Sequence, residues 1–332
     1  MNALITGGAG FVGSHLLEAL LKRDQKVTLL DDLSTGSVEN VRQLRQDPRV
    51  RCIFESMMNR SLLSELVDEA DVVYHLAAAV GVRRIIESPV RTIETNIRGT
   101  ELVLECAAKK GKPVFIASTS EVYGKNAHAP FREDDDIVLG ASSRSRWSYA
   151  TSKLLDEFLA FAYFREKKVP VVIGRLFNTV GPRQTGRYGM VLPTFIRQAM
   201  EGAPITVFGS GEQSRCFGYV EDVVKAIIGL MECDRAVGEV VNIGNTEEIT
   251  MRELAEVVKD RLRSPSRIQF VPYDQAYAPG FEDMMRRVPS VDKLHSLVGF
   301  RPTTTLSVII DRVIEHLNGE RKSMAVAQAV AS

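Results

Sequence analysis

The chain has 332 residues, of which 45% are hydrophobic and 25% charged, as in an ordinary globular protein. Its 42 Lys and Arg residues balance 42 Asp and Glu residues, so no net positive field draws nucleic acid or an anionic membrane surface, and no apolar run approaches membrane-spanning length. The four cysteines lie far apart and form no cluster with histidine, so we expect free thiols in a reducing cytoplasm and no metal site.

Short apolar runs alternate with helical patterns over the first 180 residues. The runs predicted as strands are Ala3–Thr6, Val27–Leu30, Val72–Leu76, Val114–Ala117 and Val169–Leu176. They are apolar throughout instead of alternating, as is typical of parallel strands covered on both faces. Helices between them, such as one from Val12 to Leu21, imply right-handed crossovers. The sequence therefore predicts an α/β fold with a Rossmann-type doubly wound parallel sheet.

After residue 181 the pattern changes to shorter elements punctuated by Gly and Pro. A helix is predicted from Val220 to Met231, and a second over 250–263, where Thr250 and Glu253 form a capping box. We expect residues 181–320 to form a smaller, mixed C-terminal substrate-binding lid, with some segments returning to the first part. The small-residue-rich stretch 321–332 is predicted to be a flexible tail.

A glycine-rich turn stands between the first strand and the first helix. Gly7, Gly10 and Gly13 permit a sharp turn and let a pyrophosphate approach the helix N-terminus, where free N–H groups favour an anion. The next strand ends at Asp31 and Asp32, where a carboxylate would accept hydrogen bonds from an adenosine ribose and repel a 2′-phosphate. The order of these features predicts that residues 1–180 form an NAD-binding domain, with NAD favoured over NADP.

Three residues predict the chemistry. Tyr149 and Lys153 are four apart on a predicted helix and so share one face. A phenol has a pKa near ~10, and a nearby ammonium stabilises its phenolate, so the pair makes a usable general base. Thr119 follows a strand at the carboxyl end, where sheets of this kind bind ligands, and can hold a substrate hydroxyl against the Tyr149 oxygen.

The chain resembles the extended short-chain dehydrogenase/reductases of the NAD-dependent epimerase/dehydratase family. Matching segments run from Leu4 to about Pro302 and include TGGAGFVGSHL, LDDLSTG, VVYHLAA, STSEVYG, YATSK, RLFNTVGPR and VFGSGEQSRCFGYVEDVV. One departure is Glu55-Ser56-Met57-Met58, which stands where the family has a Gly-Asp pair near the adenine.

The resemblance implies a set of site residues. The catalytic residues would be Thr119, Tyr149 and Lys153, with Ser120 and Glu121 beside them. The cofactor contacts would come from Gly7, Gly10, Phe11, Val12, Gly13, Asp31, Asp32, Leu76, Ala77, Ala78, Asn96, Tyr149, Lys153 and Phe177. The nucleotide-sugar contacts would come from Thr119, Asn178, Arg187, Arg215 and Arg287, and guanidinium groups suit a diphosphate because they donate in pairs.

The residues around Thr119 bear on the reaction. Ser120 replaces the Asp that sugar 4,6-dehydratases use as proton donor, which disfavours dehydration. The Thr-Ser-Glu triplet, Arg146 and the Arg287-Val288-Pro289 segment resemble UDP-glucuronate decarboxylases, whereas the Tyr-Ala-Thr-Ser-Lys segment departs from them. The favoured hypothesis is a UDP-sugar 4-epimerase that converts UDP-glucuronate to UDP-galacturonate. A UDP-glucuronate decarboxylase and a UDP-glucose 4-epimerase remain alternatives, with a non-catalytic NAD-sensing protein as a remote one.

The mechanism expected for such an epimerase is a transient oxidation. Tyr149 takes the proton of the sugar 4-hydroxyl, Thr119 orients that oxygen, and hydride passes to NAD and returns. Because the 4-keto intermediate of a uronate is a β-keto acid, an epimerase must prevent carbon dioxide loss and a decarboxylase must promote it; Arg187 is the candidate for holding that carboxylate. The resemblance also implies a homodimer through helices that include 149–163.

Overall fold

The computed structural model describes residues 1–79, 88–186, 190–276 and 282–331, with side chains described up to residue 321. A parallel sheet forms its centre, with strands in the order β11-β6-β5-β4-β1-β2-β3. The strands are β1 (Asn2–Thr6), β2 (Lys26–Leu30), β3 (Val50–Ile53), β4 (Val72–His75), β5 (Val114–Thr119), β6 (Val171–Leu176) and β11 (Glu239–Ile243). All neighbours are parallel, so the predicted doubly wound α/β fold is confirmed.

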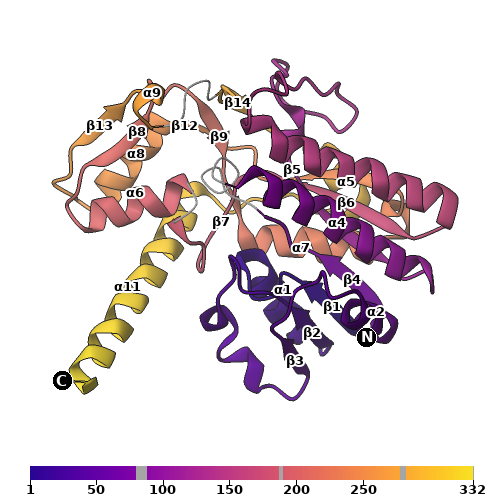
Figure 1. Ribbon diagram of the computed structural model, residues 1–332. Coiled ribbons are helices and arrows are strands. Elements are labelled where there is room, and N and C mark those ends of the chain that lie inside the picture. The colour runs from indigo at the N-terminus through magenta and orange to yellow at the C-terminus, as the bar shows by residue number, and fades with distance from the viewer. Residues whose placement is uncertain (80–87, 187–189, 277–281, 332) are drawn as a thin grey trace.

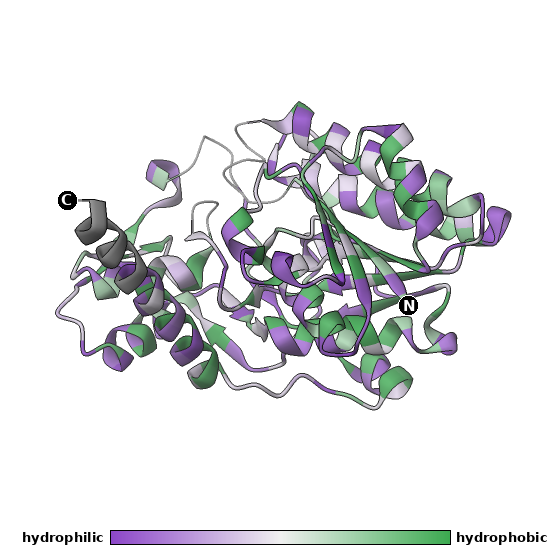
Figure 2. Cartoon of the chain, turned by 90° about the horizontal axis from the view of Figure 1, so that it is seen from below, coloured by the Kyte–Doolittle hydropathy of each residue, from purple (hydrophilic) through white to green (hydrophobic). Residues whose placement is uncertain are grey.

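Helices cover both faces of this sheet (Figures 1 and 2). The helices of one face are α1 (Phe11–Leu21) and α7 (Val220–Met231), and those of the other are α2 (Arg60–Glu69), α4 (Pro89–Ala108) and α5 (Arg146–Lys167). Most buried positions of the central strands are apolar, because both faces of the sheet are covered. The predicted first helix begins one residue earlier than expected, at Phe11.

The segment after residue 181 forms a smaller mixed region. Its helices are α6 (Val191–Met200), α8 (Met251–Arg261), α9 (Tyr273–Ala276), α10 (Asp292–Val298) and α11 (Leu306–Ala331). Of its strands, β8 (Ile205–Phe208) pairs with β13 (Ile268–Val271), and β9 (Ser214–Cys216) pairs with β12 (Glu248–Thr250) and β14 (Arg286–Arg287). Strand β10 (Gly218–Tyr219) pairs with β7 (Thr179–Val180), which directly precedes this segment. The predicted helix over 220–231 and the Thr250–Glu253 capping box are both confirmed.

The two parts of the chain are interleaved. β11 pairs with β6 at one edge of the central sheet, and α7 packs against α1, although both elements follow residue 181. Helix α11 extends away from the body of the molecule in Figure 1 and is continuous to Ala331, while the predicted flexibility of the tail stays a prediction. Two sheet strands, β3 and β11, were not predicted from the sequence.

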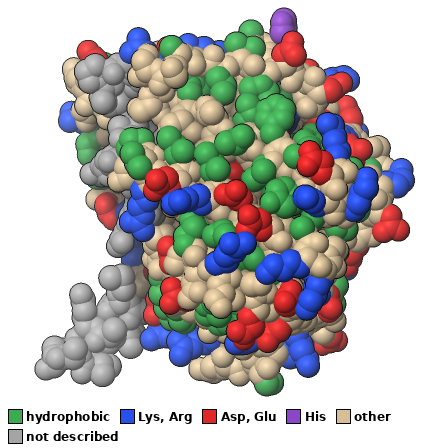
Figure 3. All heavy atoms as spheres, turned by 45° about the vertical axis from the view of Figure 1, so that its right-hand side comes forward, with side chains coloured by type: hydrophobic (Ala, Val, Ile, Leu, Met, Phe, Trp, Pro, Cys, Tyr) green, Lys and Arg blue, Asp and Glu red, His purple; other side chains and the backbone are tan. Residues whose placement is uncertain are grey.

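The surface has the mixed character that the balanced composition predicts. Figure 3 shows acidic and basic side chains interspersed over the face that it displays, with apolar side chains between them. All four cysteines are free thiols, as predicted. Within the described ranges, no helix is both long and apolar enough to cross a membrane.

Candidate active site

The glycine-rich turn follows β1 and leads directly into α1. Gly7 has a φ of +75°, and a Cβ at Gly13 would lie 2.2 Å from the carbonyl oxygen of Gly7, so neither position accepts a side chain without rearrangement. Gly10 is the N-cap of α1 and offers no side chain to its first N–H groups. These donors are therefore open to a bound anion, as the sequence predicts.

This turn lines a cavity of about 380 Å³. The predicted cofactor residues on its wall are Gly7, Gly10, Phe11, Val12, Gly13, Asp31, Asp32, Leu76, Ala77 and Ala78. The segment Glu55-Ser56-Met57-Met58, which departs from the family pattern, lines the same cavity. Ser34, Thr35, Gln184 and Thr185 also line it and were not predicted.

The two adjacent carboxylates at the end of β2 have different roles. Asp31 is buried, and its carboxylate accepts hydrogen bonds from the backbone N–H of Ala9 at 2.9 Å and of Leu33 at 2.8 Å. It thereby fixes the glycine-rich turn against the end of the strand, and burial raises its pKa. Asp32 is exposed on the cavity wall, where a ribose could reach it. The backbone turn, the open helix N-terminus and Asp32 together fit the dinucleotide NAD.

Asn96 and Phe177 are not on the described wall of this cavity. Asn96, from α4, accepts a hydrogen bond from Ala79 N at 2.8 Å and donates to Ser152 Oγ at 3.1 Å. It thus joins the loop after β4 to α5. Phe177 is fully buried and packs against Tyr123. Both residues make structural contacts near the site, and their predicted contacts with the cofactor stay a prediction.

The predicted catalytic residues meet where β5 ends against α5. Thr119 is the last residue of β5, and its side chain forms a hydrogen bond with Tyr149. Burial raises the pKa of Tyr149 above its ordinary value, the negative charge of Glu121 raises it further, and the Thr119 hydrogen bond and the charge of Arg146 lower it. Ionising this phenol therefore depends on added positive charge or on an acceptor for its proton.

Lys153 lies one helical turn after Tyr149 and is almost completely buried. Its ammonium donates to Asp156 Oδ2 at 2.7 Å. The lysine that the sequence pairs with Tyr149 is thus also paired with a buried carboxylate on its own helix. Asp156 was not predicted, although its position three residues after Lys153 places both side chains on one helix face.

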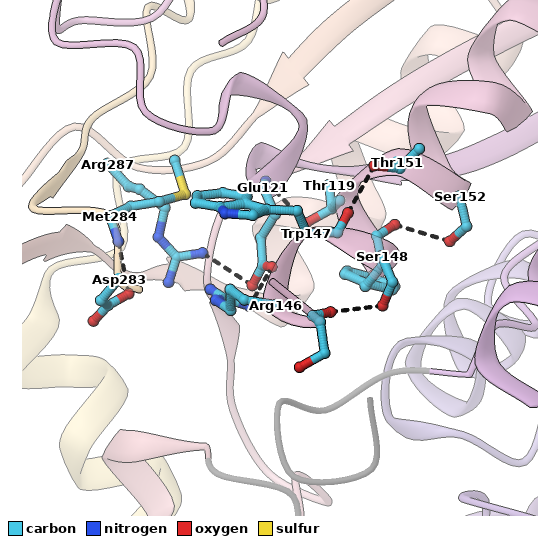
Figure 4. Close-up of polar contacts among 12 residues, drawn as sticks. Thr119, Glu121, Arg146, Trp147, Ser148, Thr151, Ser152, Asp283, Met284 and Arg287 are labelled. Atoms are coloured by element: carbon cyan, nitrogen blue, oxygen red, sulfur yellow. Dashed lines mark hydrogen bonds and ion pairs between the residues drawn. The ribbon is translucent and has the colours of Figure 1, made fainter. Parts of the chain in front are cut away.

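Glu121 lies between two guanidinium groups. It is in the short 3₁₀ turn Ser120–Tyr123, next to the buried Ser120, and its Oε2 accepts from Arg146 Nη1 at 2.6 Å. Its Oε1 lies 3.5 Å from Arg287 Nη1. Figure 4 shows Arg146 and Arg287 approaching Glu121 from two elements, α5 and β14. The sequence resemblance to UDP-glucuronate decarboxylases includes Arg146, but Arg146 was not among the predicted site residues.

The predicted arginines on β9 and β14 lie side by side. The parallel register pairs Arg287 with Arg215, and Arg215 Nη2 contacts Asp283 Oδ1 at 2.9 Å. Burial and the neighbouring charge of Arg215 lower the pKa of Arg287 to about 9. Its Nε is buried and has no hydrogen-bond partner in the part of the chain that the structure describes. Among the described residues, the guanidinium groups of Arg146, Arg215 and Arg287 contact the carboxylates of Glu121 and Asp283. The excess of positive charge suits an anionic substrate.

Two other predicted substrate residues have different outcomes. Asn178 has a φ of 28° and donates from Nδ2 to the carbonyl oxygen of Cys216 at 3.0 Å, so it attaches the end of β6 to β9. A direct contact with the sugar stays a prediction. Arg187 lies outside the described residues.

The chain combines three features: a parallel seven-stranded sheet, a glycine turn at the carboxyl end of its first strand, and a Thr–Tyr–Lys group. Together they define a dinucleotide-dependent enzyme of the short-chain dehydrogenase/reductase type. Residues 3–244 match the NAD dependent epimerase/dehydratase family, and the chain belongs to that family. The predicted family and the predicted use of NAD are thereby confirmed.

Its relatives include both decarboxylases and epimerases of UDP-sugars. The chain is 43% identical to UDP-N-acetyl-alpha-D-glucosaminuronate decarboxylase of Bacillus cytotoxicus, over 92% of this chain and 94% of the relative. It is 36% identical to UDP-glucuronic acid decarboxylase 1 of Danio rerio, over 98% of this chain and 75% of the relative. Among solved structures, UDP-glucuronic acid 4-epimerase from Bacillus cereus, in complex with UDP-glucuronic acid and NAD, is 30% identical, with a TM-score of 0.86 over 96% of this chain and 99% of that one.

Proposed function

We propose that this enzyme oxidises a UDP-linked hexuronate at C4 and decarboxylates it, with UDP-N-acetylglucosaminuronate as the first candidate substrate and UDP-glucuronate as the second. The observation that carries the proposal is the position of Glu121, which Arg146 and Arg287 hold beside the Thr119–Tyr149 pair. The similarity to the two UDP-uronate decarboxylases over nearly the whole chain supports it.

The first step follows from the Thr119–Tyr149 pair. The Tyr149 phenolate takes the proton of the sugar 4-hydroxyl, and Thr119 fixes the oxygen that loses it. Bound NAD would supply the acceptor for the C4 hydride and the source of its return, so that no net redox change would occur. The positive charge of Lys153, one turn along the helix, favours the phenolate.

The second step follows from the product of the first. A 4-keto uronate is a β-keto acid, and breaking its C5–C6 bond releases carbon dioxide and leaves an enolate whose charge develops on the C4 oxygen. A proton from solvent then adds at C5 and restores the C4 ketone, which the returning hydride can reduce. Tyr149, which now carries a proton, and Thr119 can donate hydrogen bonds to the C4 oxygen of the enolate. The chain therefore stabilises the developing charge with the same two side chains that bound the hydroxyl.

The charges beside this pair favour decarboxylation. Arg146 and Arg287 attract a substrate carboxylate, while the fixed charge of Glu121 opposes it. A carboxylate held beside Glu121 is bound without being strongly stabilised. Its loss releases neutral carbon dioxide, and the electron pair of the broken C5–C6 bond passes to the enolate. An epimerase must instead turn the 4-keto sugar over within the site. Epimerisation of UDP-glucuronate is the alternative reaction, because the Bacillus cereus epimerase matches nearly the whole fold.

The test uses UDP-glucuronate and UDP-N-acetylglucosaminuronate labelled with ¹³C at C6, each incubated with the enzyme and catalytic NAD, and UDP-glucose in parallel. Labelled carbon dioxide together with a UDP-pentose in the NMR spectrum is the expected result. UDP-galacturonate with the label retained would make the enzyme an epimerase instead. Conversion of UDP-glucose alone would exclude a uronate as the substrate. Intact NAD binding without any turnover would favour a non-catalytic NAD-sensing protein.

A variant separates the two steps. Glu121→Gln is expected to slow carbon dioxide release by about 100-fold, because the two arginines then hold the substrate carboxylate more tightly, while NADH still forms in a single turnover. Glu282→Gln is the matched control: that carboxylate pairs with Lys125 and Trp147 at a more exposed position. Equal effects of the two substitutions would contradict the assignment of Glu121.

A further inference from the structure

Asp156 is a fully buried carboxylate that the reaction described above does not use. It lies on α5, three residues after Lys153, and is 0% exposed. Its Oδ2 receives the Lys153 ammonium at 2.7 Å, and its Oδ1 has no hydrogen-bond partner among the described residues. A side chain that served packing alone would be apolar here, because an ionised carboxylate is costly to bury unless a charged partner compensates it.

The partner is itself costly to bury. Lys153 is 2% exposed, and a buried ammonium without a counter-charge loses its proton readily. Each member of the pair thus keeps the other ionised inside the protein. Because Lys153 lies one helical turn from Tyr149, the state of this pair decides whether a positive charge is available beside the phenol.

The groups around the pair come from four elements. His75 from β4 feels the charge of Lys153, which together with burial lowers the histidine pKa to about 3, so this ring is neutral. Thr100 from α4 and Glu157 from α5 face Asp156. Tyr149 feels the charges of Glu121, Asp156 and Arg146. Burial raises the pKa of Asp156, and the Lys153 ammonium is the largest influence that lowers it.

A line of buried polar side chains connects this pair to the cofactor turn. Thr100 Oγ1 lies 3.2 Å from His75 Nε2, and His75 Nδ1 lies 2.8 Å from Thr6 Oγ1. Thr6 immediately precedes Gly7 and accepts a hydrogen bond from Ala77 N on the cavity wall at 3.4 Å. Disturbing Asp156 therefore disturbs groups that reach the cofactor turn as well as the catalytic helix.

We propose that Asp156 is a positioning residue of the reaction, which acts through Lys153 by compensating its buried ammonium and holding it in place beside Tyr149. The inference depends on the NAD chemistry of the family and not on which UDP-sugar is converted. Its role does not require contact with substrate or cofactor.

The test is the pH dependence of NAD affinity, measured by calorimetry without substrate for the wild type and for Asp156→Asn. Wild-type affinity is expected to change by less than about threefold between pH 6.5 and 9.0. In Asp156→Asn it is expected to weaken by about tenfold or more over the same interval, because a buried ammonium without its counter-charge is deprotonated more readily as pH rises. A weakening of the same size at both pH values would overturn the proposal, since loosened packing alone has that effect.

The matched control is Glu157→Gln, the next residue on the helix. Glu157 is equally buried but pairs with Arg175, so any loss of NAD affinity in this variant is expected to be independent of pH. A pH-dependent loss of the same size in Glu157→Gln would also overturn the proposal, because the effect would then belong to any buried charge on α5.

A second comparison covers the case in which Asp156→Asn fails to fold. Removing both members of a buried pair leaves no uncompensated charge, so Lys153→Met/Asp156→Asn is expected to fold. Its NAD affinity is expected to equal that of Lys153→Met within about twofold at both pH values, because Asp156 has no effect once Lys153 is gone. A difference of about tenfold would show that Asp156 acts independently of the lysine.

Discussion

The buried ion pair that attaches the catalytic helix to the sheet offers a quantitative prediction of stability. Glu157, on α5, receives Arg175 Nη2 at 2.8 Å on one oxygen and Nε at 3.0 Å on the other, and Ser118 of β5 also donates to it. The side chains of both ionic partners are at most 5% exposed. Glu157→Gln removes the carboxylate that receives the buried Arg175 guanidinium.

The expected cost follows from this burial. Breaking a buried pair by removing one partner typically costs about 3–5 kcal/mol of the free energy of unfolding. The entropy of unfolding for a chain of this length is about 0.7 kcal/mol/K, so Tm should fall by about 4–7 °C. Arg175 keeps its contacts with the carbonyl oxygen of Glu133 and with the ring of Tyr123, which limits the loss to this range.

The assay is thermal and urea unfolding, monitored by circular dichroism, of Glu157→Gln, Arg175→Met and the double variant. Because the double variant carries no unpaired charge, it should be more stable than the sum of the two single losses implies, by at least about 1 kcal/mol. A single-variant loss below about 1 kcal/mol would refute the reasoning, as would strict additivity.

Three further predictions concern the site and the assembly. Gly13→Ala should abolish NAD binding in calorimetry, since its Cβ would lie 2.2 Å from the Gly7 carbonyl oxygen; unchanged affinity would contradict the close approach of turn and helix. Glu121→Gln should shift the acid limb of the pH–rate profile of single-turnover NADH formation to lower pH by about one unit. The reason is that Glu121 raises the pKa of Tyr149, so its loss leaves more phenolate at low pH. An acid limb that stays in place or moves to higher pH would be evidence against Tyr149 as the base. Phe158 is 65% exposed on α5 and should lie in the predicted homodimer interface. Phe158→Glu should therefore give monomers in light scattering, and a wild-type protein that is already monomeric would contradict the prediction.

The sequence by itself determined the features that depend on local pattern. The continuous apolar runs gave the parallel sheet, and the glycine spacing gave the turn at Gly7 and Gly13 where a Cβ has no room. The four-residue spacing of Tyr149 and Lys153 placed both on one helix, and Thr119 at a strand end faces the phenol. Each of these follows from helix or strand geometry over a few residues, so no knowledge of distant contacts is needed.

Only the tertiary structure decided which charges meet. Arg287 reaches Glu121 because β14 pairs in parallel with β9 beside the end of β5, a register that no local pattern encodes. No local pattern encodes the difference between the two aspartates either: the Asp31 carboxylate accepts a hydrogen bond from the glycine-rich turn, while Asp32 remains exposed. Asp156 could be placed beside Lys153 from spacing, but its complete burial, which makes the pair mutually dependent, results from the packing of α5 against α4 and the sheet. Burial sets the cost of each charge, and burial is a property of the assembled fold.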